Sequence, residues 1–447
     1  MENPNELGSE KISKLIWKFT IPAITGMLVN ALYNIVDSIF VGHGVGAVGL
    51  AAVTLSFPVM IILMGFGMLV GVGATTLISI RIGQHKKDEA EKLLGIALVL
   101  GIVFAFALTS LFLLFLDPIL AILGADASIL PYAKDFLIPI LAGSVFMFIG
   151  FGLNNIIRAE GHPKIAMLTM LISAILNTLL NPLFIFVFEL GIQGSALATV
   201  VSQAVSAAWV IWHFTLGNSF LKLRTRNLRL DRKIVFDIMA MGSSAFFMQV
   251  AASMVAGLFN FILTLQGGQT AVAAMGIINR VSMLILMPLF GISQGTQPII
   301  GYNYGAKNYA RVKEAVVTGS LAATAVSIAG FILIEGFDTY IIRLFSTDAE
   351  LISMGALGLR IFLCMLPLIG FQVIGATLFQ AIGKPKHSLL VSMSRQLLIL
   401  VPALLILPRF WGLWGVWLSG PISDLVSTAI TVILVIQQLK ALKYKPT

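Results

Sequence analysis

The stretch that decides the fold is residues 15–41, LIWKFTIPAITGMLVNALYNIVDSIFV. It is long enough to cross a membrane, which takes about 20 apolar residues, yet it contains the carboxylate of Asp37. A charge inside a spanning helix is costly and often marks an ion pathway or proton relay. Pro22 predicts a bend, because proline removes a helical hydrogen bond. The stretch therefore favours a transporter whose acid binds an ion. The alternative is a structural Asp37 that is hydrogen-bonded to Tyr33, Asn34 or another helix.

The composition of the whole chain agrees with an integral membrane protein. Of its 447 residues, 58% are hydrophobic and 11% charged, and the mean hydropathy is +0.97, whereas soluble domains carry about 25% charged residues. The single cysteine, Cys364, excludes an intrachain disulfide and a thiolate cluster. The five histidines are scattered, so no metal site and no cofactor is expected. The motifs GxxxxGK[ST] and HExxH are absent, which disfavours an ATP-driven pump and a zinc enzyme.

Twelve apolar segments are long enough to span a bilayer as helices. The predicted fold is therefore all-α, with spans at residues 14–41, 49–81, 93–116, 131–157, 163–188, 190–216, 234–266, 270–302, 313–337, 349–380, 386–408 and 412–439.

The basic residues predict how these spans are oriented. With twelve spans, the lysines and arginines of loops 81–92, 158–164 and 217–233 all fall on one side, while the opposite loops are mostly acidic. Basic loops stay in the cytoplasm, so both termini are predicted to be cytoplasmic. The N-terminus also lacks a signal-peptide pattern. The net charge of +9 fits this orientation and does not require a nucleic-acid partner.

The two halves of the chain repeat each other at an offset of about 222 residues, a sign of repeated transporter architecture. Gly73 matches Gly295, and RAEGHPK (158–164) matches QAIGKPK (380–386). Six spans per half keep both halves in the same orientation, so the repeats are predicted to be parallel. The predicted domains are an N-lobe (1–216), a basic cytoplasmic linker (217–233) and a C-lobe (234–447).

Several motifs, in order, resemble the multidrug and toxic compound extrusion (MATE) family. They are IPAITGMLVNALYNIVDSIFVG in the first span, GVGATTLISIRIGQ at the end of the second, NNIIRAEGHPK after the fourth, NTLLNPLFIF in the fifth, GIQGSALATVVSQ in the sixth, and QGTQPIIGYNYGAK and LFQAIGKPK in the second half. The chain is most similar to the prokaryotic DinF-like branch, named after a DNA-damage-inducible protein. The other large bacterial branch typically has an acid in span 7, which is absent here.

The resemblance implies two lobes in a V that alternate access and exchange an external cation for a drug. It also implies a cation site in the N-lobe, carried over by position to Asp37, Asn154, Asn177, Asn181 and Thr199. The position of Asn181 is commonly aspartate in related proteins. Asparagine cannot ionise, although its carbonyl can still accept a hydrogen bond or coordinate sodium. Asp37 is therefore expected to carry the proton, or Na⁺, as the only acid of this site.

Other polar and flexible residues within the spans supply further candidates. Asp424 is expected to pair with Arg280, Arg360 or Arg395, because a lone buried charge is expensive; the alternative is a direct role in coupling. Methionine and aromatic side chains suit a large adaptable pocket for organic cations. The candidates for this pocket are Phe19, Met27, Tyr33, Phe57, Met60, Met64, Met254 and Met283.

The leading functional hypothesis is a secondary antiporter that expels hydrophobic or cationic drugs from a prokaryotic cell. It is expected to be a monomer in the inner membrane, in contact with lipid, and not an enzyme. The chief alternative is a flippase for lipid-linked oligosaccharides, which shares the two-lobe architecture but needs a cationic cavity to hold pyrophosphate. A membrane-embedded transferase is a third alternative, disfavoured because the outer loops are short and lack a metal-binding carboxylate cluster.

Overall fold

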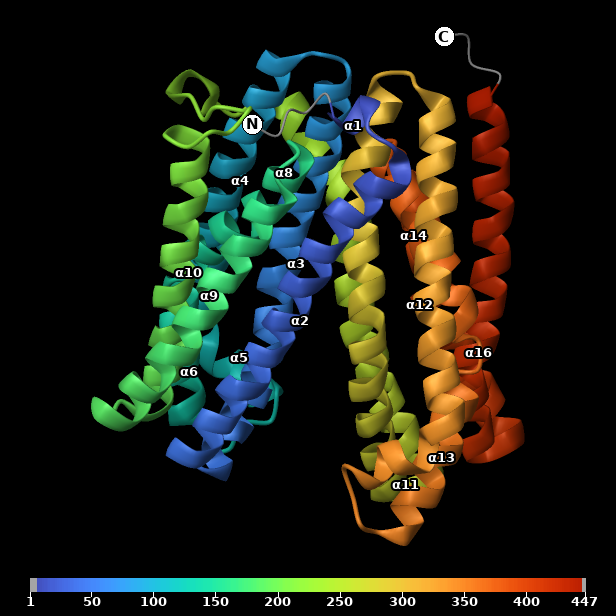
Figure 1. The fold of residues 1–447 in the computed structure, drawn as a ribbon. Helices are drawn as coiled ribbons and strands as arrows, with labels where there is room; N and C mark the ends of the chain where they lie inside the picture. Colours follow the sequence, from blue (N-terminus) through green and yellow to red (C-terminus); the bar gives the residue numbers. More distant parts are fainter. Residues whose placement is uncertain (1–5, 444–447) are drawn as a thin grey trace. The chain divides into compact units, whose positions relative to one another are not determined.

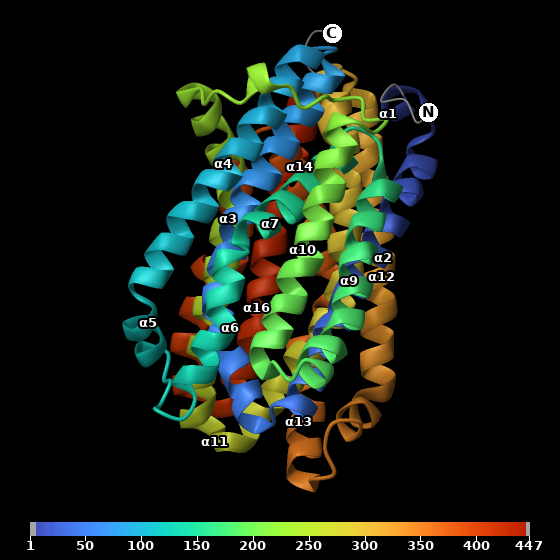
Figure 2. The same cartoon turned by 90° about the vertical axis from the view of Figure 1, so that its left-hand side faces the viewer.

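The computed structural model describes residues 6–443, and every regular element within that range is helical. Figures 1 and 2 show long helices running along a common direction within each half of the chain. The α-helices are α1 (Glu6–Ser9), α2 (Ile12–Gly44), α3 (Ala47–Gly83), α4 (Lys87–Leu114), α5 (Leu116–Ile122), α6 (Leu130–Ala142), α7 (Ser144–Met147), α8 (Leu153–Ala159), α9 (Pro163–Pro182), α10 (Gly191–Thr215), α11 (Arg232–Gly305), α12 (Tyr309–Arg343), α13 (Ala349–Phe362), α14 (Leu366–Ala381), α15 (Pro385–Met393) and α16 (Leu400–Lys443). Shorter π and 3₁₀ segments are η1 (Phe148–Gly152), η2 (Leu183–Val187), η3 (Thr225–Asn227) and η4 (Ser394–Ile399).

The twelve predicted spans can all be traced in this helical chain. Eight helical stretches are long and apolar enough to cross a membrane, and two bent pairs, α6 with α7–α8 and α13 with α14, raise the number to ten. Two of these ten stretches are long enough to contain two spans each. The helix α11 contains 74 residues, about 110 Å at 1.5 Å per residue, and the stretch Pro385–Leu442 is similarly long. The predicted all-α fold with twelve spans is confirmed.

Glycines make the breaks inside the two double stretches. Gly268 in α11 has φ 62° and ψ −158°, and Gly412 in α16 has φ 55° and ψ −133°. Glycine lacks a β-carbon and therefore adopts these angles without strain. The chain turns at these residues and starts the next span.

The positive-φ residues also reveal the internal repeat. Eight of the ten described residues with this backbone conformation form pairs at corresponding places in the two halves, separated by 222 positions in three cases and by 221 in the fourth: Gly46 and Gly268, His85 and Lys307, Gly161 and Gly383, and Gly191 and Gly412. The four turns that contain these pairs are therefore built in the same way in both halves.

Packing divides the chain into two compact units that exchange short helical segments. The N-terminal unit contains Thr25–Phe246, and the C-terminal unit contains Glu10–Ile24 together with the residues from Phe247 onward. Each unit therefore includes one helical segment from the other half of the sequence. The predicted linker, residues 217–233, lies within the N-terminal unit.

Small residues allow the exchanged segments to approach their partners closely. In the N-terminal unit, Gly73 faces the backbone of Ile238, and Gly242 faces that of Leu69. In the C-terminal unit, a β-carbon at Gly295 would lie 2.8 Å from the Thr20 hydroxyl oxygen. Close contact through glycine is a common way to pack helices in membranes, where there is little hydrophobic driving force between helices. Larger residues at these positions would force the helices apart.

Each unit has its own apolar core. In the N-terminal unit it includes Leu63, Phe136 and Phe148. In the C-terminal unit it includes Leu359 and Trp417. These cores hold the helices that carry the buried polar side chains described below.

Candidate ion site of the N-terminal unit

The carboxylate of Asp37 lies on α2 and receives two hydrogen bonds from other helices. Its Oδ1 accepts one from Asn181 Nδ2 on α9 at 2.7 Å and one from Ser195 Oγ on α10 at 2.8 Å. None of the described lysines or arginines forms a salt bridge with it. Asp37 is therefore held by neutral donors alone, while its side chain remains only partly buried.

Further hydrogen bonds hold Asn181, one of the two donors to Asp37, in place. Asn181 Nδ2 also donates to Asn177 Oδ1 at 2.9 Å, and Asn177 Nδ2 donates to Thr199 Oγ1 at 3.0 Å. Residues four apart share one face of a helix, which explains why Asn177 and Asn181 both reach this place from α9. The structure thus brings four of the five predicted residues together.

Two buried amide oxygens within the predicted set have no hydrogen-bond partner. These are Asn181 Oδ1 and Asn154 Oδ1, and both residues are at most 2% exposed. A buried polar atom without a partner is costly. Asn154 lies on α8, and no described hydrogen bond links it to Asp37. The unpaired oxygen of Asn181 belongs to the same amide that donates to Asp37, so the site has an unused acceptor.

Sequence reasoning missed Ser195, which donates directly to Asp37. A signal for it was present, because Ser195 precedes Thr199 by four residues and therefore lies on the same face of α10. A hydroxyl on that face was a candidate donor as soon as Thr199 was placed in the site.

The residues that the sequence suggests for a substrate pocket are divided between the two units. Among the pocket candidates, Phe57, Met64, Met254 and Met283 have exposed side chains, and Phe19 is only 2% exposed. Tyr33, Met60 and Met27 are partly buried. The large exposed side chains can contact lipid or a solute, whereas Phe19 packs inside the C-terminal unit.

The acid of the C-terminal unit has a charged partner. Asp424 on α16 is 2% exposed, and its Oδ1 accepts a hydrogen bond from Arg395 Nε at 2.6 Å. Arg395 lies in η4, and its backbone carbonyl accepts a hydrogen bond from Ser423 Oγ at 2.6 Å. This arrangement gives the buried carboxylate a cation and fixes the position of that cation.

The remaining two arginines of the predicted C-lobe network lie elsewhere. Arg360 pairs with Glu335 at 3.2 Å and with Asp338 at 3.1 Å. Arg280 is exposed and has no ion pair among the described residues. Arg395 is thus the arginine that the structure places against Asp424.

Comparison with known proteins places the chain in a family. The family model described as MatE matches it twice, over residues 22–183 and 244–405. The two matches begin 222 residues apart, the offset at which the turns repeat. With this agreement in sequence, fold and repeat, the chain belongs to the MATE family of membrane transporters, which are not enzymes.

Relatives over nearly the full length are multidrug exporters. The multidrug export protein MepA of Staphylococcus aureus (strain MSSA476) is 28% identical over 424 residues, which cover 95% of this chain and 93% of the relative. The solved structure of the MATE multidrug transporter DinF-BH in complex with the dye rhodamine 6G is 40% identical, with a TM-score of 0.91 and 98% of both chains covered. An outward-facing multidrug resistance MATE transporter is 27% identical, with a TM-score of 0.92 and the same coverage. The predicted family and its DinF-like branch are confirmed.

Proposed function

We propose that this protein exports hydrophobic or cationic organic compounds in exchange for a proton or a sodium ion that binds at Asp37. The observation that carries this proposal is the charge balance around Asp37, whose hydrogen-bond partners within residues 6–443 are the amide of Asn181 and the hydroxyl of Ser195. An ionised carboxylate without a cation is expensive within a membrane. Binding a proton or a monovalent cation removes that cost, and release of the ion restores it.

The neighbouring oxygens support sodium as well as a proton. The unpaired Oδ1 of Asn181 and the hydroxyl of Ser195 are neutral oxygens beside a carboxylate. Hard cations take carboxylate, amide and hydroxyl oxygens as ligands. A proton needs only the carboxylate, so the same group of residues serves either ion.

The substrate class is inferred from the relatives. A structure of DinF-BH holds a rhodamine dye, and the staphylococcal relative is a multidrug export protein. The same rhodamine dye is therefore the first compound to test on this chain.

The function can be tested with the purified full chain in liposomes. A pH gradient or a sodium gradient is imposed, and the movement of the rhodamine dye is recorded. We expect one of the gradients to drive dye transport in the wild type and in Asp88→Asn, which removes a carboxylate that is 88% exposed. Asp37→Asn should show no gradient-driven transport.

Two results would contradict the proposal. One is gradient-driven transport by Asp37→Asn at the wild-type rate. The other is transfer of a lipid-linked pyrophosphate sugar without any gradient-driven movement of the rhodamine dye, which would favour the flippase.

The proposed orientation places both termini and residues 217–233 in the cytoplasm of a prokaryotic cell. It can be tested with single cysteines at Thr225 and Ala127, both exposed, in a Cys364→Ala background. An impermeant thiol reagent added outside the cell should label position 127 and not position 225. The reverse pattern would overturn the orientation.

A further inference from the structure

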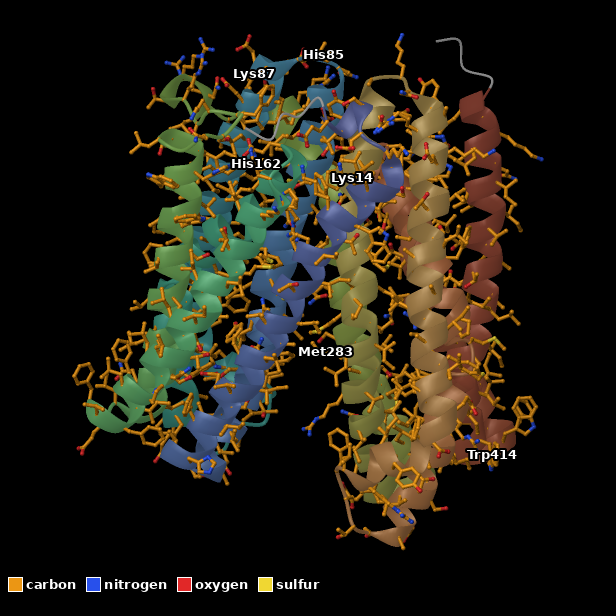
Figure 3. All side chains as sticks on the ribbon, viewed as in Figure 1. Lys14, His85, Lys87, His162, Met283 and Trp414 are labelled. Carbon is orange, nitrogen blue, oxygen red and sulfur yellow. The ribbon has the colours of Figure 1, made fainter. Side chains whose placement is uncertain are left out.

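Three buried side chains meet in the N-terminal unit, away from Asp37. Glu160 directly follows α8, His162 directly precedes α9, and His213 lies in the last turn of α10. They are 0%, 8% and 1% exposed, respectively. Figure 3 shows His162 toward the same end of this unit as His85 and Lys87. The antiport proposed above uses none of these three residues.

The two histidines face the same carboxylate oxygen. Glu160 Oε1 is hydrogen-bonded to His213 Nε2. His162 Nδ1 lies 3.3 Å from the same oxygen, but it is buried and makes no hydrogen bond of ordinary geometry. The three atoms all lie within 4.8 Å of one another. His162 Nδ1 therefore lies beside the carboxylate without a hydrogen bond among the described residues.

The second oxygen of Glu160 fixes the orientation of the carboxylate. Oε2 accepts hydrogen bonds from Ser219 Oγ at 2.6 Å and from the backbone N–H of Leu221 at 3.1 Å. The carboxylate is thus held in one orientation, and such hydrogen bonds are typical around metal ligands.

We propose that Glu160, His162 and His213 form a binding site for a divalent transition-metal ion such as Zn²⁺. Two imidazole nitrogens and one carboxylate oxygen are a ligand set that zinc takes at about 2.0–2.2 Å, with a fourth position for water. In a tetrahedral site, such bonds hold neighbouring ligand atoms about 3.3 Å apart. His162 and Glu160 already have this spacing. A bound metal would replace the proton that lies between Glu160 and His213, and these two side chains would then move apart.

The site lies where it can fasten the segment that joins the two halves of the chain. Through Glu160, a bound metal would stabilise the contacts with Ser219 and Leu221. The residues after Leu221 contact Glu91 of α4. The Glu91 carboxylate accepts a hydrogen bond from the backbone N–H of Lys222 at 3.2 Å and pairs with Arg224 at 3.1 Å. The metal would therefore tie the start of residues 217–233 to the N-terminal unit.

Zinc binding can be measured directly on purified full-length protein without a histidine tag. The protein is stripped with a chelator, and the bound Zn²⁺ per chain and its dissociation constant are measured by elemental analysis and calorimetry. We expect one Zn²⁺ per chain and a higher melting temperature with metal. His162→Gln should weaken binding at least about tenfold without changing the melting temperature of the metal-free protein, because His162 Nδ1 makes no hydrogen bond there.

The matched control is His85→Asn, which removes an exposed histidine at the same end of the unit. Asparagine tolerates the φ of 58° at this position, so the control should bind Zn²⁺ like the wild type. The proposal is overturned if the wild type binds no stoichiometric Zn²⁺ at about 100 μM, an affinity far below that of structural zinc sites. It is also overturned if His162→Gln binds as tightly as the wild type.

A second measurement tests the tie to the joining segment. Trypsin should cleave after Arg224 and Arg226 more slowly with Zn²⁺ than without it in the wild type, and at equal rates in His162→Gln. Equal rates in the wild type would show that the metal does not fasten this segment.

Discussion

The two acids Asp37 and Asp424 lie in spanning helices of different units, but their surroundings differ in charge. Asp37 is partly buried and, in the described part of the chain, receives hydrogen bonds from one amide and one hydroxyl. Asp424 is 2% exposed and bound to Arg395. A buried ion pair is balanced in charge and holds its members in place, whereas an acid with neutral partners can still gain a cation. The proposed ion site is therefore inferred from the neutral partners of Asp37 and not from the presence of an acid in a spanning helix.

The repeat sharpens this contrast, because neither acid has a counterpart in the other half. At the offset of 222 residues, the position of Asp37 corresponds to Phe259, which lies in the apolar core of the C-terminal unit. In the last span of each half the offset is 221, so the position of Asp424 corresponds to Gln203, which is neutral and partly buried. The two halves therefore share their turns and helix contacts but differ in their buried polar groups.

The largest expected effect is the loss of transport in Asp37→Asn. Asparagine retains the shape of the side chain but cannot bind a proton or balance a cation, so gradient-driven transport of the rhodamine dye should fall by roughly two orders of magnitude, to the level of protein-free liposomes. The melting temperature in detergent should not decrease, because a poorly compensated charge has been removed. A lower melting temperature together with retained transport would mean that Asp37 is structural.

Removing the cation from the other acid should affect stability instead. Arg395→Ala leaves Asp424 buried without a partner, and such a loss typically costs about 3–5 kcal/mol. Thermal unfolding of the purified variant measures this change. The double variant Arg395→Met with Asp424→Leu removes both charges and should recover most of the stability. If its transport remains gradient-driven in liposomes, the pair is structural; if the stable double variant loses coupling, the distinction between the two acids fails.

Restoring an acid beside Asp37 should change the pH dependence of transport. In Asn181→Asp, two carboxylates would lie within hydrogen-bond distance and share protons, so the pH of half-maximal transport should move by about one unit or more. The pH profile of dye transport in liposomes is the measurement, with thermal stability recorded alongside. An unchanged profile at unchanged stability would place position 181 outside the ion site.

The smallest expected effect concerns the hydroxyl donor. Ser195→Ala removes one of two hydrogen bonds to Asp37 Oδ1, worth about 1.5 kcal/mol for a charged acceptor. The ion concentration that gives half-maximal transport should therefore change by about tenfold or less. Ser202→Ala is the matched control on α10, because that hydroxyl bonds only the carbonyl of Ala198. Equal behaviour of the two variants would remove Ser195 from the site.

Much of the fold could be predicted from the sequence because membrane spans, basic loops and an internal repeat are local or periodic signals. Asp37 was evident for the same reason, as an acid in an apolar stretch. The partner of Asp424 could not be predicted, because the three candidate arginines lie in different spans and the sequence does not distinguish between them. The contact of Glu160 with His213 joins loop and helix residues 53 positions apart, and no local spacing predicts it. Helical periodicity could have indicated Ser195. Serine is common in spanning helices, however, so its presence there did not single it out as a donor to Asp37.

The exchanged helical segments have a consequence for biosynthesis. Residues 10–24 emerge from the ribosome first, but their packing partners, Gly291 and Gly295, are made only after more than half of the chain. Conversely, the N-terminal unit is incomplete until Ile238 and Gly242 have been added. The first half of the sequence therefore cannot complete the N-terminal unit until the segment up to Phe246, beyond the joining segment, has been made. A truncated chain that ends at the joining segment lacks the segment that completes the N-terminal unit. It should therefore be degraded by quality-control proteases. Co-expression of the second half as a separate chain should supply that segment and reduce the degradation.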